Sequence, residues 1–222
     1  DSDCAGNYAC QGGGGGNCEV ETPTAALTLP DGVCQDPLNP TPETCSAYEA
    51  TFALTGFPGG ATVANASDLV SICASMEHSW IRDLQIEAEC PNGQVVRLNE
   101  FLGQQGGEVY LGSPVHEEED IFTGPAQNPQ PGTGGNYCWT MSGSMEMLAR
   151  ANQLQPNELG PPVTLPAGDY LPSDSFAGFV GCPLNGTWKI RVIDEWEFDN
   201  GFIFSSGFTF DGSLSDDCPV IE

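Results

Sequence analysis

Basic residues are scarce in this chain, which has 5 lysines and arginines against 31 aspartates and glutamates and a formal net charge of −26. A field this negative repels the phosphates of nucleic acids and the surfaces of anionic membranes, so we exclude both as partners. Most of the carboxylates are expected to serve only as a solvated surface. The same charge favours divalent cations, because hard cations prefer oxygen ligands.

Long hydrophobic runs are also absent: no stretch approaches the roughly 20 apolar residues that span a bilayer, so we expect no membrane insertion. Histidine occurs only as His78 and His116, and no Gly-x-Ser-x-Gly motif is present. A triad of His78, Asp83 and one of many serines can be written down, but scattered residues do not indicate the geometry that catalysis needs. The sequence predicts that the protein is not an enzyme.

Cysteine, in contrast, is abundant, with 10 residues. None of them has the paired Cys-x₂₋₄-Cys spacing of zinc sites, so disulfides explain them better. Many cysteines in a chain of this kind predict an oxidising compartment. The chain begins at Asp1 rather than at methionine, as it would after removal of an export signal peptide. We therefore expect an extracellular or surface-exposed protein.

Residues 1–45 differ in composition from the rest of the chain. They combine a run of five glycines and proline-rich turns with five of the cysteines, Cys4, Cys10, Cys18, Cys34 and Cys45. Apolar periodicity is too weak here for a core, so we predict a mostly irregular arm whose shape is fixed by disulfides. The glycine run lacks the Lys-Ser/Thr ending of a phosphate-binding loop.

The remaining cysteines constrain how this arm is attached. Four lie in the body of the chain, Cys73, Cys90, Cys138 and Cys182, and Cys218 lies in the C-terminal tail, residues 213–222. If all ten are paired, at least one bridge must leave the arm, because five is an odd number. Cys218 is the natural partner, and such a bridge would tie the two ends of the chain together.

Residues 46–212 have the pattern of an all-β domain, with short alternating segments separated by turn residues. Residues 83–90 and 94–98 flank Pro91-Asn92-Gly93 and predict a hairpin. Residues 142–155 have helical spacing and predict one short helix. Further strands are predicted at residues 50–55, 68–73, 137–140, 163–165, 169–171 and 176–180. The whole is interpreted as a jelly-roll β-sandwich.

The last part of this domain, residues 184–210, is interpreted as a closing hairpin around an acidic loop. Trp188, Ile190 and Val192 alternate with Lys189 and Arg191, so Trp188 is expected in the core. Phe202, Phe204, Phe208 and Phe210 alternate in the same way around Gly207. Asp194 lies on the apolar side of the first strand, where burial without a partner would be costly. It could bind calcium, cap loop amides or be exposed.

Three segments together resemble the P domain that accompanies proprotein convertases. They are residues 75–98 (SMEHSWIRDLQIEAECPNGQVVRL), residues 165–169 (LPAGD) and residues 181–210, which contain GCPLNGTWKIRVID and DNG. The cysteine-containing form, with CPNG, YCW and GCPLNGTW, is similar to modules in secreted surface proteins of Bacteroidota. The resemblance covers residues 46–212 and leaves the arm outside.

This resemblance implies a non-catalytic jelly roll that often binds calcium. The positions that match the family are Asp83, in its Asp-Leu motif, and Asp194 and Asp199, which flank the last loop. We add Glu77 as a fourth candidate ligand for Ca²⁺. Loop residues 195–198 are Glu-Trp-Glu-Phe rather than the glycine-rich sequence that is common in the family.

Together these observations predict a structural or adhesive module at a bacterial cell surface. Its expected partners are copies of itself or other surface proteins. One alternative is a carbohydrate-binding module that uses Trp80 and Trp196, since jelly rolls often carry glycans on aromatic side chains; packing in the core is the competing interpretation of both. Another is an accessory domain of a secreted subtilisin-like protease.

Overall fold

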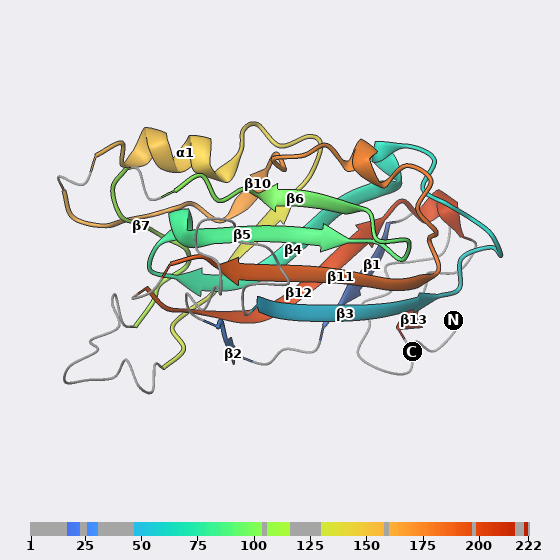
Figure 1. The fold of residues 1–222 in the computed structure, drawn as a ribbon, viewed down its shortest axis with the longest axis horizontal. Helices are drawn as coiled ribbons and strands as arrows, with labels where there is room; N and C mark the ends of the chain where they lie inside the picture. Colours follow the sequence, from blue (N-terminus) through green and yellow to red (C-terminus); the bar gives the residue numbers. More distant parts are fainter. Residues whose placement is uncertain are drawn as a thin grey trace.

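The protein is a β-sandwich of two stacked sheets (Figure 1). A computed structural model describes residues 17–22, 26–30, 47–103, 106–115, 130–157, 160–196, 199–215 and 220–221. The all-β jelly roll predicted from the sequence is confirmed. Within the described residues, no helix is long and apolar enough to cross a membrane.

The first sheet forms the rear layer in Figure 1 and has the strand order β1-β12-β4-β8-β10, with β2 also paired to β12. Its strands are β1 (Cys18–Glu21), β2 (Leu27–Thr28), β4 (Leu69–His78), β8 (Gly135–Trp139), β10 (Gly168–Tyr170) and β12 (Gly201–Phe210). β1 and β2 belong to the segment interpreted as a mostly irregular arm, and the sequence analysis did not predict them.

The second sheet forms the front layer and has the order β13-β3-β11-β5-β6. Its strands are β3 (Ala47–Thr55), β5 (Leu84–Glu89), β6 (Val95–Asn99), β11 (Gly186–Asp194) and β13 (Val220–Ile221). β5 and β6 pair in antiparallel fashion, which confirms the predicted hairpin. The turn needs Gly93, whose φ of 85° lies in the left-handed region.

The remaining elements lie around the rims of the sandwich. β7 (Val109–Tyr110) and β9 (Val163–Thr164) form a small parallel pair. The predicted helix is present as α1 (Met147–Leu154). Single 3₁₀ turns span Ala66–Asp68, Ile81–Asp83, Phe176–Phe179 and Gly212–Leu214. The prediction of a strand at residues 176–180 is therefore wrong: Phe176 and Phe179 are both buried, but from a turn.

β11 and β12 do not form the predicted hairpin, because they lie in different sheets. β11 pairs with β3 and β5, whereas β12 pairs with β1, β2 and β4. The acidic segment between them crosses from one layer of the sandwich to the other. Alternation along each strand is the same in both arrangements, so the pattern alone could not distinguish them.

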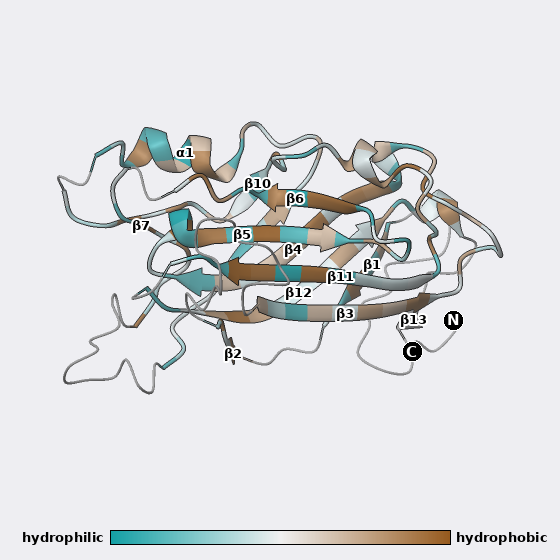
Figure 2. Ribbon diagram, in the orientation of Figure 1, coloured by the Kyte–Doolittle hydropathy of each residue, from teal (hydrophilic) through white to brown (hydrophobic). Residues whose placement is uncertain are grey.

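A cluster of aromatic rings fills one end of the space between the sheets, and we call this the aromatic end. Trp188 is fully buried there, as predicted, and its ring centroid lies 5.4 Å from that of Phe208 and 5.6 Å from that of Phe210. Phe179 and Phe52 extend the cluster, with mostly edge-to-face contacts. Such packing combines a large buried apolar area with favourable ring geometry. Figure 2 shows the apolar positions alternating with polar ones along β5 and β11.

An irregularity in β12 divides the predicted phenylalanine alternation. The pairing with β4 shifts register between Ile203 and Ser205. Phe208 pairs with Ile72 and faces the core, whereas Phe202 pairs with Glu77 on the outer face of the first sheet. A bulge changes the face that later residues present, so Phe202 and Phe208 serve different surfaces.

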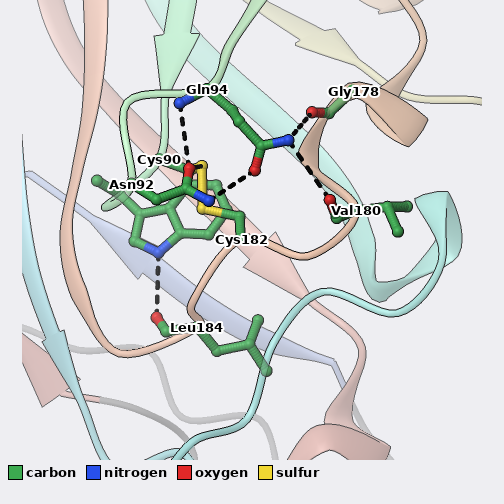
Figure 3. The surroundings of a disulfide bond; sticks show 8 residues. Cys90, Asn92, Gln94, Gly178, Val180, Cys182 and Leu184 are labelled. Carbon is green, nitrogen blue, oxygen red and sulfur yellow. Dashed lines mark hydrogen bonds between the residues drawn. A yellow bond between two sulfur atoms is a disulfide. The ribbon is translucent and has the colours of Figure 1, made fainter.

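Two disulfides join the four cysteines of the body. Cys73 bonds to Cys138 between the neighbouring strands β4 and β8, and Cys90 bonds to Cys182 beside the turn of Gln94 (Figure 3). These bridges indicate an oxidising, extracellular environment. The pairing also removes Cys182 as a partner for Cys218. The predicted bond of Cys218 lies outside the described residues, as do Cys4, Cys10, Cys34 and Cys45; Cys18 is itself disulfide-bonded.

Candidate functional site

At the end of the sandwich opposite the aromatic cluster, the space between the sheets holds ionisable side chains. β4 of the first sheet ends at His78, and β11 of the second sheet ends at Asp194. Both side chains turn inward and both are fully buried. Asp83, Glu195 and Asp199 come from the segments that follow these strand ends, and each is at least nine-tenths buried. We call this group of five residues the acidic end.

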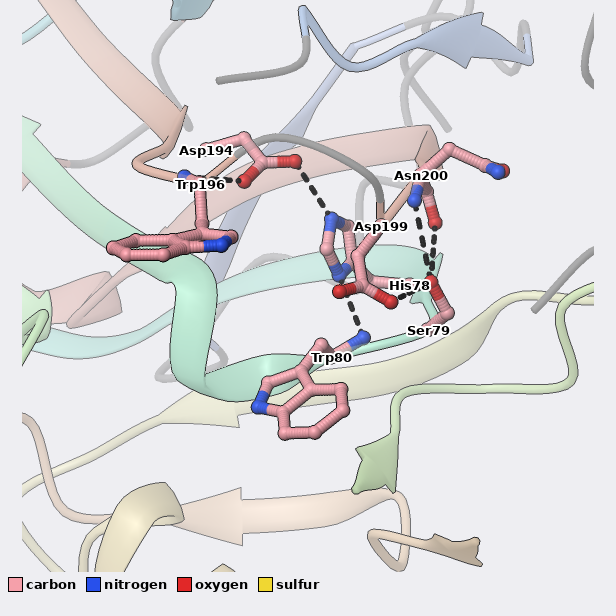
Figure 4. Close-up of polar contacts among 7 residues, drawn as sticks. All are labelled: His78, Ser79, Trp80, Asp194, Trp196, Asp199 and Asn200. Atoms are coloured by element: carbon pink, nitrogen blue, oxygen red, sulfur yellow. Dashed lines mark hydrogen bonds and ion pairs between the residues drawn. The ribbon is translucent and has the colours of Figure 1, made fainter. Parts of the chain in front are cut away.

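His78 uses both of its ring nitrogens (Figure 4). The backbone N–H of Trp80 donates to Nδ1 at 2.9 Å, and Nε2 lies 2.9 Å from the Oδ2 atom of Asp194. Because an amide can only donate, Nδ1 is the acceptor, and the proton lies on Nε2. The neutral tautomer thus donates to Asp194, which also accepts the N–H of Trp196 at 3.3 Å. Asp194 therefore caps a loop amide. Of the three roles expected for it from the sequence, simple exposure is wrong.

A second set of contacts holds Asp199. Its Oδ1 atom accepts a hydrogen bond from the Ser79 hydroxyl at 2.9 Å, and the N–H of Asn200 donates to the same hydroxyl oxygen at 3.2 Å. Burial raises the pKa of Asp199, and the charge of His78 and hydrogen bonds with Ser79 and Asp83 partly oppose this. Asp83 and Asp199 are thus neighbouring carboxyl groups, both buried between the sheets.

The acidic end carries negative charge without basic side chains among its neighbours in the described ranges. Arg82 lies within the 3₁₀ turn Ile81–Asp83 (η2), next to Asp83 in sequence, but its guanidinium donates elsewhere, to the carbonyls of Gly107 and Gln155 and to Asn152. Burial, together with the charges of Asp194 and Glu87, raises the pKa of Glu195 to about 7. The cluster as it stands is therefore short of positive charge.

Glu77 lies apart from the other candidate ligands. It precedes His78 on β4, so the alternation of the strand directs it to the outer face of the first sheet. Its Oε1 atom accepts the N–H of Gly132 at 3.3 Å, and its Oε2 atom is buried without a hydrogen-bond partner. Burial raises the pKa of Glu77 to about 7.

The two tryptophans considered for glycan contact differ in exposure. Trp196 is 48% exposed, whereas Trp80 is half-buried and its Nε1 atom is enclosed without a partner. In Figure 4 the two rings lie apart, on either side of η2, rather than forming one platform. Trp139 and Trp188 are fully buried, so of the four only Trp196 is substantially exposed.

The chemical types of the ligand atoms at the acidic end fit calcium better than the arrangement of these atoms does. Buried carboxyl oxygens and backbone carbonyls are the ligands that calcium takes. Across the described residues, however, no group of three or more histidine, cysteine, aspartate or glutamate side chains is arranged to hold a metal ion. The neighbouring buried carboxyl groups of Asp83 and Asp199 mark the position where a cation could bind.

Sequence reasoning placed Asp83, Asp194 and Asp199 together but missed the residues that connect them. His78 was considered only as part of a triad with Asp83, and Ser79 and Asn200 were not considered. The His78–Asp194 contact joins residues 116 positions apart. The only sequence signal for it is that both residues end alternating apolar strands, which indicates burial but not a partner.

Comparison of this chain with family models, with curated proteins and with solved structures finds no match. The P-domain resemblance therefore remains an expectation from the motifs, and the class of protein that the structure defines is a disulfide-containing, all-β sandwich.

Proposed function

We propose that this protein is a non-enzymatic, calcium-binding jelly-roll module that acts as a structural or adhesive subunit at a bacterial cell surface, exported with a signal peptide that is later removed. Three features support this proposal: the disulfides, the strongly acidic composition and the P-domain-like motifs. The acidic end carries it, because two neighbouring carboxyl groups buried between the sheets are a group that a cation would stabilise.

Asp83 and Asp199 would hold the ion, with Glu195 nearby. Calcium would supply positive charge that this end of the sandwich otherwise lacks. The protein's own contribution is positioning: His78 fixes Asp194, Asp194 holds the Trp196 amide, and Ser79 orients Asp199. The ion would thus link the segment after β4 to the segment that crosses between the sheets. Its role is to stabilise the fold.

The arrangement of His78 supports a non-catalytic role. A general base must have a free nitrogen to accept a proton from a nucleophile or water. Here Nδ1 accepts an amide and Nε2 donates to Asp194, and the Ser79 hydroxyl donates to Asp199 instead. The side chains of His78, Asp194, Ser79 and Asp199 are all buried.

Thermal unfolding with calcium or with a chelator tests the proposal. A ligand that binds only the folded state stabilises it by about 2.7 kcal/mol at 100 times its Kd, so we expect a clear rise in Tm with calcium. D83N and D199N should abolish this rise without lowering the Tm of the chelated protein, because each replaces a buried carboxyl group with a neutral amide. D169N, a matched change at an exposed carboxylate, should respond like the wild type. An unchanged Tm in calcium would contradict the proposed calcium site.

Carbohydrate binding is a second candidate, favoured by the exposure of Trp196. An exposed indole can stack on the apolar face of a sugar. On a glycan array, we expect any such binding to be lost in W196A and retained in W80A, because the Trp80 ring is the less exposed of the two. Equal binding by W196A and the wild type would eliminate this candidate.

A further inference from the structure

The long edge of the second sheet is formed by β3, and over most of its length no other described strand pairs with it. β3 has nine residues and pairs with β11 on one side without a register shift. On its other side, the two-residue strand β13 pairs with Thr55 and Leu54. Among the described residues, nothing pairs with the outer side of residues 47–53. In Figure 1 this edge runs along the lower rim of the front layer.

The backbone groups along this edge point outward at alternate residues. The N–H of Glu195 donates to the carbonyl of Asp83, so the odd-numbered residues of β11 direct their polar groups toward β5. The even-numbered residues of β11 then face β3, and they pair there with residues 48, 50 and 52. The backbone groups of Glu49 and Thr51 consequently point away from the sheet.

The other three edges of the sandwich are short or covered. β1 has four residues and carries the exposed Glu19 and Glu21. β10 has three residues and continues into Leu171, whose N–H is bonded to Met145. The backbone N–H groups of Ser173 and Asp174 donate to carbonyls of β6. Short, charged or covered edges resist the addition of a further strand. β3 is long and regular and has no proline or lysine, and its one charged residue, Glu49, is neutralised by ion pairs with Lys189 and Arg191.

The outer face beside β3 is also where this acidic chain is neutralised. Glu49 is paired with Lys189 at 3.4 Å and with Arg191 at 2.7 Å, and Arg191 also contacts Glu89 at 2.6 Å. With Arg97, three of the five basic residues of the chain lie on this face. Two molecules with a formal charge of −26 repel each other, and the ion pairs of Glu49 reduce this repulsion beside β3.

We propose that the β3 edge is an interaction surface for a second copy of this chain, whose own β3 adds to it in antiparallel orientation about a two-fold axis. β13 demonstrates that the edge accepts an antiparallel strand. β3 of a second copy presents the alternation that the position requires, with Ala50 and Phe52 toward the core and Glu49 and Thr51 toward solvent. Pairing of this kind joins two five-stranded sheets into one and closes both edges.

The inference rests on the proposed self-association of the protein, and the T51P variant tests it. Thr51 is exposed and directs its N–H outward, and proline is tolerated on an edge strand. We expect T51P to weaken dimerisation roughly tenfold or more, since the two-fold axis removes two N–H···O bonds. T51A, which keeps the N–H, should dimerise like the wild type. Sedimentation from micromolar to millimolar concentration, with the full chain in moderate salt, provides the measurement.

Hydrogen exchange provides a second readout that does not depend on the variants. In the wild type, the amides of Glu49 and Thr51 should exchange more slowly as concentration rises, while those of β1 should not change. If copies associate equally in T51P and T51A while T51P unfolds normally, they pair through another surface and the β3 inference is wrong. If the wild type stays monomeric throughout, proposed self-association fails together with it, whereas calcium binding is tested separately.

Discussion

The two ends of the sandwich interior are built from the same two strands but differ in chemistry. β11 begins near Trp188 at the aromatic end and finishes at Asp194 at the acidic end, and β12 runs back from Gly201 to Phe210. At the aromatic end, rings contact each other at centroid distances of 5 to 6 Å, and their burial stabilises the fold directly. At the acidic end, the buried groups depend on specific hydrogen bonds.

This difference indicates which end of the sandwich has a stability that depends on pH and on ion concentration. The aromatic end should contribute equally at all pH values and ion concentrations. The acidic end should respond to both, since burial raises the pKa of Asp199 and, to about 7, the pKa of Glu195. Glu77, on the other face of the same strand end, also has a pKa of about 7.

The largest effect is expected from W188A, which breaks the aromatic end. Trp188 is fully buried, and its Nε1 atom donates to the carbonyl of Leu184 at 3.0 Å. Removal of a buried tryptophan side chain leaves a cavity and should lower the free energy of unfolding by about 3–5 kcal/mol. Urea denaturation measures it. W196A, the same change at a half-exposed ring, should cost less than about 1 kcal/mol, and equal losses would show that the two ends do not differ in this way.

A smaller effect of opposite sign is expected from E77Q. The pKa of Glu77 is about 7 in the folded protein and 4.5 as a free side chain, so the folded state holds the proton more tightly. Its contribution to stability is complete below pH 4.5 and is lost as the pH rises through 7. At pH 8 the glutamine variant should therefore be about 3 kcal/mol more stable than the wild type, with no gain at pH 4.

Urea titrations at both pH values check this prediction. E21Q, at an exposed carboxylate of the same sheet, is the matched control and should leave the pH dependence unchanged. A gain in E77Q that persists at pH 4 would mean that the carboxylate is unfavourable for a reason other than its ionisation.

Much of the fold was predictable because its signals are local. The 83–98 hairpin has a turn that requires glycine, and the burial of Trp188 and Asp194 follows from alternation along one strand. What failed was long-range or depended on a single residue. The alternation of apolar residues along β12 does not reveal to which sheet this strand belongs. The bulge after Ile203 places Phe202 on the other face, and no glycine or proline in the sequence marks it. Strands of two to four residues, such as β2 and β13, are too short to carry a pattern.

The site was predictable to a similar degree. Three of the four candidate ligands, Asp83, Asp194 and Asp199, converge because they follow or end inward-facing strands. Glu77 does not, since it is one residue out of phase with His78. The hydrogen-bond partners of Asp194 and Asp199, His78 and Ser79, are more than a hundred residues away in sequence. Only the fold brings them together.

The two disulfides have a mechanical consequence for a module attached at its ends. Both remain covalent when the strands between them are pulled apart. Tension transmitted from Cys73 to Cys182 follows residues 73–90 and then the Cys90–Cys182 bridge, which removes 92 residues from the path. At roughly 3.3–3.6 Å per residue, about 300 Å of chain therefore cannot extend. Pulled by its ends in an oxidising medium, the protein would extend only through residues outside this loop, and the greater part of its core sequence would stay in a closed loop able to refold when the force is released.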